Sequence, residues 1–102
     1  MVKNKEHILS IIKNKRAKIE SFGVKKLGLF GSFVRKSQKP TSDIDLLVEF
    51  YPNEKNFDNF IHLSFLLKTL LKRHIELVTL ESLSPYIKPN IMNEVEYVIS
   101  RG

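Results

Sequence analysis

The sequence predicts an α+β fold, with a small mixed β-sheet covered by helices, in a single domain spanning residues 1–102. Apolar residues recur at helical spacing near the N-terminus and again in the middle of the chain. Between these segments lie short, nearly continuous apolar runs that have the length of buried strands. A chain of 102 residues that is 42% hydrophobic is long enough to bury one modest core.

The expected order of elements is helix, strand, short helix, strand, helix, strand, helix. Their predicted bounds are residues 3–22, 24–30, 33–36, 43–50, 56–72, 75–80 and 87–100. Gly23 is a plausible C-cap of the first helix, and the turn-rich residues 37–42 form a loop. The helix between the second and third strands favours a crossover connection, and therefore a mixed sheet.

The charge balance is basic, with 17 Lys and Arg against 11 Asp and Glu and a net charge of +6. An anionic partner such as a nucleotide would explain this excess, but so would the polar outer face of a lysine-rich first helix. There is no cysteine, which excludes disulfides and thiol chemistry. The polar N-terminus and the absence of a long apolar stretch predict a cytoplasmic protein without a membrane partner.

Gly31 and Ser32 interrupt the first strand at a junction with a helix. Glycine lets the backbone approach a ligand closely, and the first amides of a helix have no partner inside it. Such a junction is a phosphate-binding arrangement. Arg35 lies about one helical turn farther on and can reach the same site. Each feature alone is compatible with an ordinary turn, and it is their combination that predicts a site.

Asp43 and Asp45 alternate with apolar residues at the start of the second strand. Residues two apart on a strand share a face, so these carboxylates project together from backbone positions roughly 6–7 Å apart. Ile44, Leu46 and Val48 have the opposite phase and can enter the core. Neighbouring carboxylates repel each other, and a cation stabilises them. Paired magnesium ions in phosphoryl-transfer sites lie about 3.5–4 Å apart, which two converging aspartates can bridge.

Glu76 on the third strand is the candidate third carboxylate, because its apolar neighbours Ile75 and Leu77 have the opposite phase. If the third strand pairs beside the second, Glu76 lines up with the aspartates. The alternative is a solvent-facing glutamate without a role in a site.

Residues 29–35 (LFGSFVR) and 42–48 (SDIDLLV) resemble the nucleotidyltransferase superfamily that includes DNA polymerase beta. The resemblance is strongest to its minimal nucleotidyltransferase branch, whose members are often paired with HEPN proteins in toxin–antitoxin systems. Residues 75–80 and 85–99 also fit the layout of that family. The resemblance covers most of the chain from about Phe22 onward, and the Gly-Ser and Asp-x-Asp motifs are its specific part.

The resemblance implies a magnesium-dependent enzyme that moves a nucleoside monophosphate from an NTP, with ATP as the expected donor, onto a hydroxyl group. A tyrosine of a HEPN-type toxin is the candidate acceptor, which would make the protein an antitoxin. The residues that it assigns to nucleotide binding are Gly31, Ser32, Arg35 and Ser42. The residues that it assigns to catalysis and to two Mg²⁺ ions are Asp43, Asp45 and Glu76.

Two positions depart from the pattern of the family. Glu76 stands where the third carboxylate is usually Asp, and Lys36 stands where a glycine often follows the arginine. The longer Glu76 side chain leaves open an antitoxin that has kept the fold and acts only by binding its partner, as a homo- or hetero-oligomer. An aminoglycoside-type transferase would normally carry a further domain. A nucleic-acid-binding domain is disfavoured, because no interleaved aromatic and basic motif is present.

Overall fold

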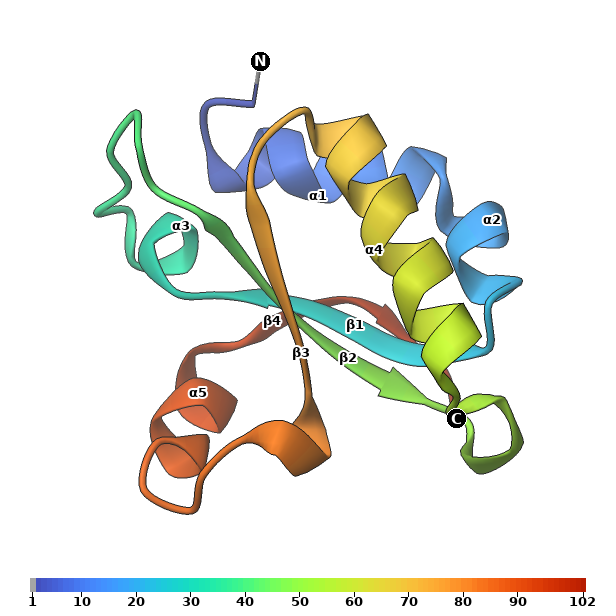
Figure 1. Ribbon diagram of the computed structural model, residues 1–102. Coiled ribbons are helices and arrows are strands. Elements are labelled where there is room, and N and C mark those ends of the chain that lie inside the picture. The colour runs from blue at the N-terminus through green and yellow to red at the C-terminus, as the bar shows by residue number, and fades with distance from the viewer. Residues whose placement is uncertain (1) are drawn as a thin grey trace.

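The computed structural model describes residues 2–102, and its centre is a four-stranded sheet in the order β3-β2-β1-β4 (Figure 1). The strands are β1 (Val24–Phe30), β2 (Ile44–Phe50), β3 (Ile75–Thr79) and β4 (Glu96–Ser100). The α-helices are α1 (Lys5–Asn14), α2 (Arg16–Glu20), α3 (Ser32–Arg35), α4 (Phe57–Leu71) and α5 (Lys88–Glu94). Two short 3₁₀ turns are η1 (Pro52–Glu54) and η2 (Leu80–Ser82). The predicted α+β fold with a mixed sheet is confirmed.

Helices α1, α2 and α4 lie together over one face of the sheet (Figure 1). Ile44, Leu46 and Val48 of β2 point into this interface and are fully buried, as their phase predicted. From the helices, the buried core residues are Ile8, Ile12, Ile19, Leu63, Leu67 and Leu71. The opposite phase of β2 carries Asp45 and Glu49 on the other face of the sheet. The apolar core therefore takes one face, and the polar groups of interest share the other.

The strand pairings bring four chain segments to one edge of the sheet. Strands β1 and β2 are antiparallel with Phe30 opposite Asp45, and β2 and β3 are parallel with Asp45 opposite Glu76. Strand β4 runs antiparallel to β1, with Leu29 opposite Glu96. The end of β1 and the beginnings of the other three strands consequently meet at this edge.

The predicted closing helix over residues 87–100 is wrong in its second half. Helix α5 ends at Glu94, Val95 is extended with φ −61° and ψ 135°, and residues 96–100 form β4. The apolar residues of this segment follow a helical pattern, but a strand here pairs with the open side of β1, whose backbone groups would otherwise stay unpaired. The β-branched residues Val95, Val98 and Ile99 also suit a strand.

The predicted first helix over residues 3–22 is interrupted. It divides into α1 and α2 at Lys15, whose φ of −113° and ψ of 21° are not helical. Neither Gly nor Pro marks the position in the sequence. The bend keeps both Ile12 and Ile19 fully buried against a twisted sheet, from which a long straight helix would diverge. No helix within residues 2–102 is long and apolar enough to cross a membrane.

The corrected C-terminal segment can be tested by comparing two alanine substitutions. Ile99 is completely buried in β4, whereas 39% of Met92 in α5 is exposed, although the helical pattern would turn both inward. We expect Ile99→Ala to lower the free energy of unfolding by about 2–5 kcal/mol, and Met92→Ala to lower it by less than about 1 kcal/mol. Urea unfolding followed by circular dichroism measures both values, and equal losses would contradict the strand assignment.

Candidate functional site

A cleft of about 390 Å³ opens at the sheet edge where the strand ends meet. Four of its lining residues are sequence-predicted site residues: Gly31, Arg35, Asp45 and Glu76. The opposite wall is built by the C-terminal segment, through Leu83, Ile87, Asn90, Ile91 and Glu94. The cleft thus joins residues that lie more than sixty positions apart in the chain.

Gly31 leaves β1 with φ 82° and ψ −153°, a backbone conformation that is essentially restricted to glycine. The residue is also in close contact with the side chain of Asp45. A Cβ atom at Gly31 would lie 2.1 Å from Oδ2 of Asp45. Both the turn and the space beside the carboxylate therefore require glycine at this position.

Glu94 contacts both groups that were predicted to bind phosphate. Its Oε2 accepts a hydrogen bond from the backbone N–H of Gly31 at 2.6 Å. Its two carboxylate oxygens also accept hydrogen bonds from Nη1 of Arg35, at 3.0 and 3.1 Å. These charge-assisted bonds fasten the end of α5 to both ends of the short helix α3. Sequence reasoning missed Glu94. The only signal in the sequence was its position just before the apolar β4 segment, which does not indicate a site.

Asp45 of β2 and Glu76 of β3 line the cleft, whereas Asp43 lies in the loop before β2, outside the lining. Partial burial is the main cause that raises the pKa of Asp45 from its ordinary value of 3.8 to about 6. The nearby negative charges of Glu76 and Asp43 raise this pKa further, in that order, and Arg35 lowers it. The charged form of Asp45 is therefore destabilised in this site, and a cation beside it would relieve the repulsion.

Asp43 and Glu76, the other two carboxylates predicted to bind metal, lie in different surroundings. Oδ1 of Asp43 lies 3.0 Å from Nδ1 of His74, and Glu76 is solvent-exposed beside Asp45. Within residues 2–102, no three His, Asp or Glu side chains converge closely enough to hold a metal ion as they stand. The donor set nevertheless consists of carboxylate oxygens, which are the ligands that Mg²⁺ prefers. Their assignment as metal ligands stays a prediction.

Ser32 and Ser42 lie outside the lining of the cleft. Oγ of Ser42 accepts a hydrogen bond from the backbone N–H of Lys39 at 2.8 Å, and its own N–H donates to the carbonyl of Lys39. The carbonyl of Ser32 accepts from the N–H of Ser37 at 2.9 Å. The contacts of Ser42 thus close the loop before the aspartates, and its predicted nucleotide contact remains untested.

Lys36 occupies the position where the resemblance leads one to expect glycine. Its φ of 59° and ψ of 33° lie in the left-handed region at the end of α3. Glycine reaches this region without a steric penalty, which explains why it suits the position.

The combination of a mixed sheet, a glycine turn and paired strand carboxylates at one edge is that of a nucleotidyltransferase. The family model of the nucleotidyltransferase domain matches residues 9–98. The chain belongs to the nucleotidyltransferase domain family and is an enzyme of that class.

Known relatives agree with this assignment. The protein adenylyltransferase MntA of Thermococcus cleftensis is 39% identical over 94 residues, which cover 91% of this chain and 94% of that protein. A candidate minimal nucleotidyltransferase of known structure superposes with a TM-score of 0.70 at 25% identity, over 86% of this chain and 93% of that chain. A crystal structure of a toxin–antitoxin with AMP-PNP superposes with a TM-score of 0.65 at 25% identity, over 86% of this chain and 73% of that chain.

The raised pKa of Asp45 predicts a pH-dependent stability. Since the folded-state pKa lies above the unfolded one, the neutral carboxyl is favoured in the native state, and stability falls as the pH rises from about 4 through 6. Without divalent cations, we expect the free energy of unfolding of Asp45→Asn above pH 7 to exceed that of wild type by about 1–2 kcal/mol, a value reduced for partial exposure.

The measurement is urea unfolding of both proteins at a series of pH values in a chelating buffer. The difference between them should grow between pH 4 and 6 and then level off. Asp58→Asn, which removes an exposed carboxylate of α4, serves as the control for the loss of a surface charge. A difference that stays constant with pH would contradict the raised pKa.

The contact between Gly31 and Asp45 predicts a non-additive pair of substitutions. Gly31→Ala is expected to lower the free energy of unfolding by about 2–4 kcal/mol, since the new Cβ meets the carboxylate and the backbone conformation suits only glycine. In an Asp45→Ala background the same change should be less harmful, because the clashing oxygen is gone. Thermal or urea unfolding of the four proteins gives the coupling energy, and additive losses would show that the two residues do not touch.

Proposed function

We propose that the protein is a magnesium-dependent adenylyltransferase that transfers AMP from ATP to a hydroxyl group of a partner protein. The observation that carries the proposal is the row formed by the glycine turn, Asp45 and Glu76 along one cleft. Gly31, Arg35, Asp45 and Glu76 supply, within one space, amide and guanidinium donors for phosphate and carboxylate oxygens for cations.

The reaction forms a bond between the acceptor oxygen and the α-phosphorus of ATP, and breaks the bond from that phosphorus to the bridging oxygen. Pyrophosphate leaves with the electron pair, and Glu76 would accept the proton of the acceptor hydroxyl. Arg35 and the N–H of Gly31 would bind the phosphates, for which they must exchange their contacts with Glu94. Magnesium held by Asp43, Asp45 and Glu76 would neutralise phosphate charge and polarise the acceptor oxygen.

A protein acceptor is supported by the surface around the cleft. Tyr86 is 91% exposed and Ile87, which lines the cleft, is 49% exposed. Large exposed apolar side chains beside a cleft favour contact with another protein surface. We therefore propose a HEPN-type toxin as the partner, with a tyrosine hydroxyl as acceptor and silencing of the toxin as the outcome, in line with the toxin–antitoxin structure that the chain resembles.

A neutraliser that acts by binding alone is the second candidate. It is favoured by Glu94, which holds the amide of Gly31 and the guanidinium of Arg35 in the described structure. It is favoured also by Glu76, whose carboxylate stands where the family usually has the shorter Asp.

A transfer assay separates the two candidates. The protein is incubated with ATP, Mg²⁺ and a candidate HEPN partner, and the partner is weighed by intact-mass spectrometry. We expect a mass increase of one or more AMP groups, which is absent with EDTA and reduced at least about 100-fold in the Asp43→Asn, Asp45→Asn variant. Asp58→Asn, which changes an exposed aspartate of α4, should transfer like wild type.

A stable complex without any adduct would instead support neutralisation by binding. Transfer that survives in the double variant would exclude the aspartates as the metal-binding centre. Fragment-mass mapping of the adduct then identifies the acceptor residue, and AMP carried only by side chains other than tyrosine would exclude tyrosine.

A further inference from the structure

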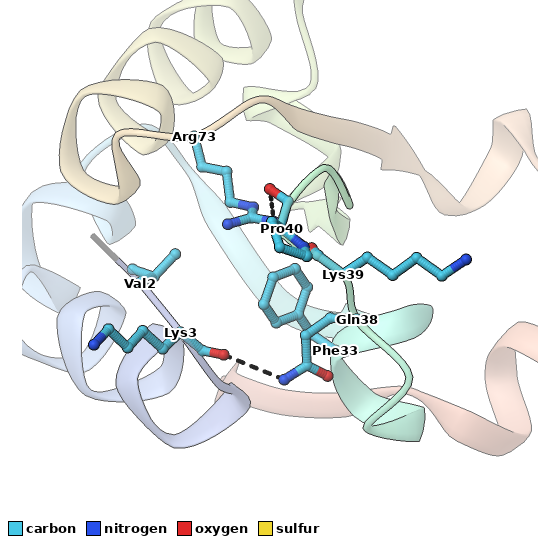
Figure 2. A pocket seen from close by; sticks show the side chains of 7 residues that line it. All are labelled: Val2, Lys3, Phe33, Gln38, Lys39, Pro40 and Arg73. Atoms are coloured by element: carbon cyan, nitrogen blue, oxygen red, sulfur yellow. Dashed lines mark hydrogen bonds between the residues drawn. The ribbon is translucent and has the colours of Figure 1, made fainter.

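Arg73 lies in the turn between α4 and β3 and binds the loop that leads into the aspartate pair (Figure 2). Its Nε donates to the carbonyl of Ser42 at 2.7 Å, directly before Asp43. Its Nη2 donates to the carbonyls of Lys39 and Pro40, each at 2.8 Å. One guanidinium group therefore holds three carbonyl groups of a four-residue stretch.

The same guanidinium also packs against α3. Its Cζ lies 5.1 Å from the centre of the Phe33 ring, a distance at which a cation is attracted to an aromatic face. Phe33 is 1% exposed and directly follows Ser32. The arginine thus links the glycine turn to the loop before Asp43.

The backbone around Arg73 is joined to the third carboxylate. The carbonyl of His74 accepts a hydrogen bond from the N–H of Ile44 at 3.0 Å, and β3 continues to Glu76 in register with Asp45. All three segments that carry predicted site residues therefore contact the arginine or its immediate neighbours. Among residues 2–102, only Arg73 joins the turn before β3 to the loop before β2 by donating hydrogen bonds to three carbonyls of that loop.

Arg73 does not face the cleft. It lines a separate cavity of about 270 Å³ together with Val2, Lys3 and Phe33 (Figure 2). This cavity and the cleft have no lining residue in common. Any influence of Arg73 on the reaction must therefore act through the loop before β2, α3 and β3.

We propose that Arg73 is a positioning residue, which sets the spacing between the glycine turn, the aspartate pair and Glu76 for nucleotidyl transfer. This inference rests on the proposed function, because it takes these residues to be the phosphate and metal ligands. A planar guanidinium directs several N–H groups at fixed angles, whereas a lysine ammonium is a flexible point donor. Lysine at this position keeps the charge and loses the geometry.

Arg101 offers a matched control at the opposite end of the sheet. Its Nε donates to the carbonyl of Val24 at 2.9 Å, and its Cζ lies 4.9 Å from the Tyr51 ring centre. Strand β1 begins at Val24 and reaches the cleft only at its other end. Both arginines donate to backbone carbonyls and lie beside an aromatic ring, although Arg101 also lies 3.9 Å from a carboxylate oxygen of Glu20. Only Arg73 holds segments of the site.

The experiment compares Arg73→Lys and Arg73→Met with Arg101→Lys and Arg101→Met. We expect kcat for AMP transfer to fall about 10- to 100-fold in both Arg73 variants, while KM for ATP changes less than about 3-fold. The Arg101 variants should lose similar thermal stability and keep kcat within about 2-fold of wild type. If Arg73→Met does not fold, Arg73→Lys alone is compared with Arg101→Lys.

A second readout does not depend on transfer. Mn²⁺ binding to the nucleotide-free protein, followed by electron paramagnetic resonance, should weaken about 10-fold in Arg73→Lys and stay unchanged in Arg101→Lys. If wild type transfers no AMP, the proposed function fails, and the Mn²⁺ affinities still decide on Arg73. Equal kcat losses at equal stability in both pairs, or unchanged Mn²⁺ affinity in Arg73→Lys, would overturn the proposal.

Discussion

The registration of β2 between its two neighbours is the constraint on which the site depends. Asp45 is paired with Phe30 of β1 on one side and with Glu76 of β3 on the other. These three residues therefore form one row across the strands at the sheet edge. The glycine turn begins one residue beyond Phe30. A shift of one residue in either pairing would turn Asp45 or Glu76 to the helix-covered face and separate them from the turn.

This register is held by the apolar face of the same strands. Ile44, Leu46 and Val48 alternate with Asp45 and pack under α1, α2 and α4, so burial of one face fixes the exposure of the other. The free energy of the core therefore offsets the repulsion at the edge, where Asp45 is half-buried near Glu76 and Asp43. Such a site is destabilising by itself and persists because the surrounding structure determines it.

Residues near each other in the chain could be predicted well. The position of Gly31 at a strand end and the alternation from Ile44 to Val48 depend on local periodicity, and the structure has both. Asp43 differs from its predicted place, because β2 begins only at Ile44 and Asp43 stays in the preceding loop, outside the lining of the cleft. Glu94 and Arg73 could not be found in this way. Glu94 contacts Gly31 across 63 positions, and Arg73 contacts Ser42 across 31, so no local pattern relates these partners.

The sequence by itself determined the α+β class, three of the four strands, and the cleft residues Gly31, Asp45 and Glu76, because alternation and turn chemistry are local properties. Only the tertiary structure decided that residues 96–100 form a strand, since the open side of β1 supplies their hydrogen bonds. It also decided which side chains hold the site together. The contacts of Glu94 and Arg73 exist only after β1, β2 and β3 have paired and brought their ends to the same edge.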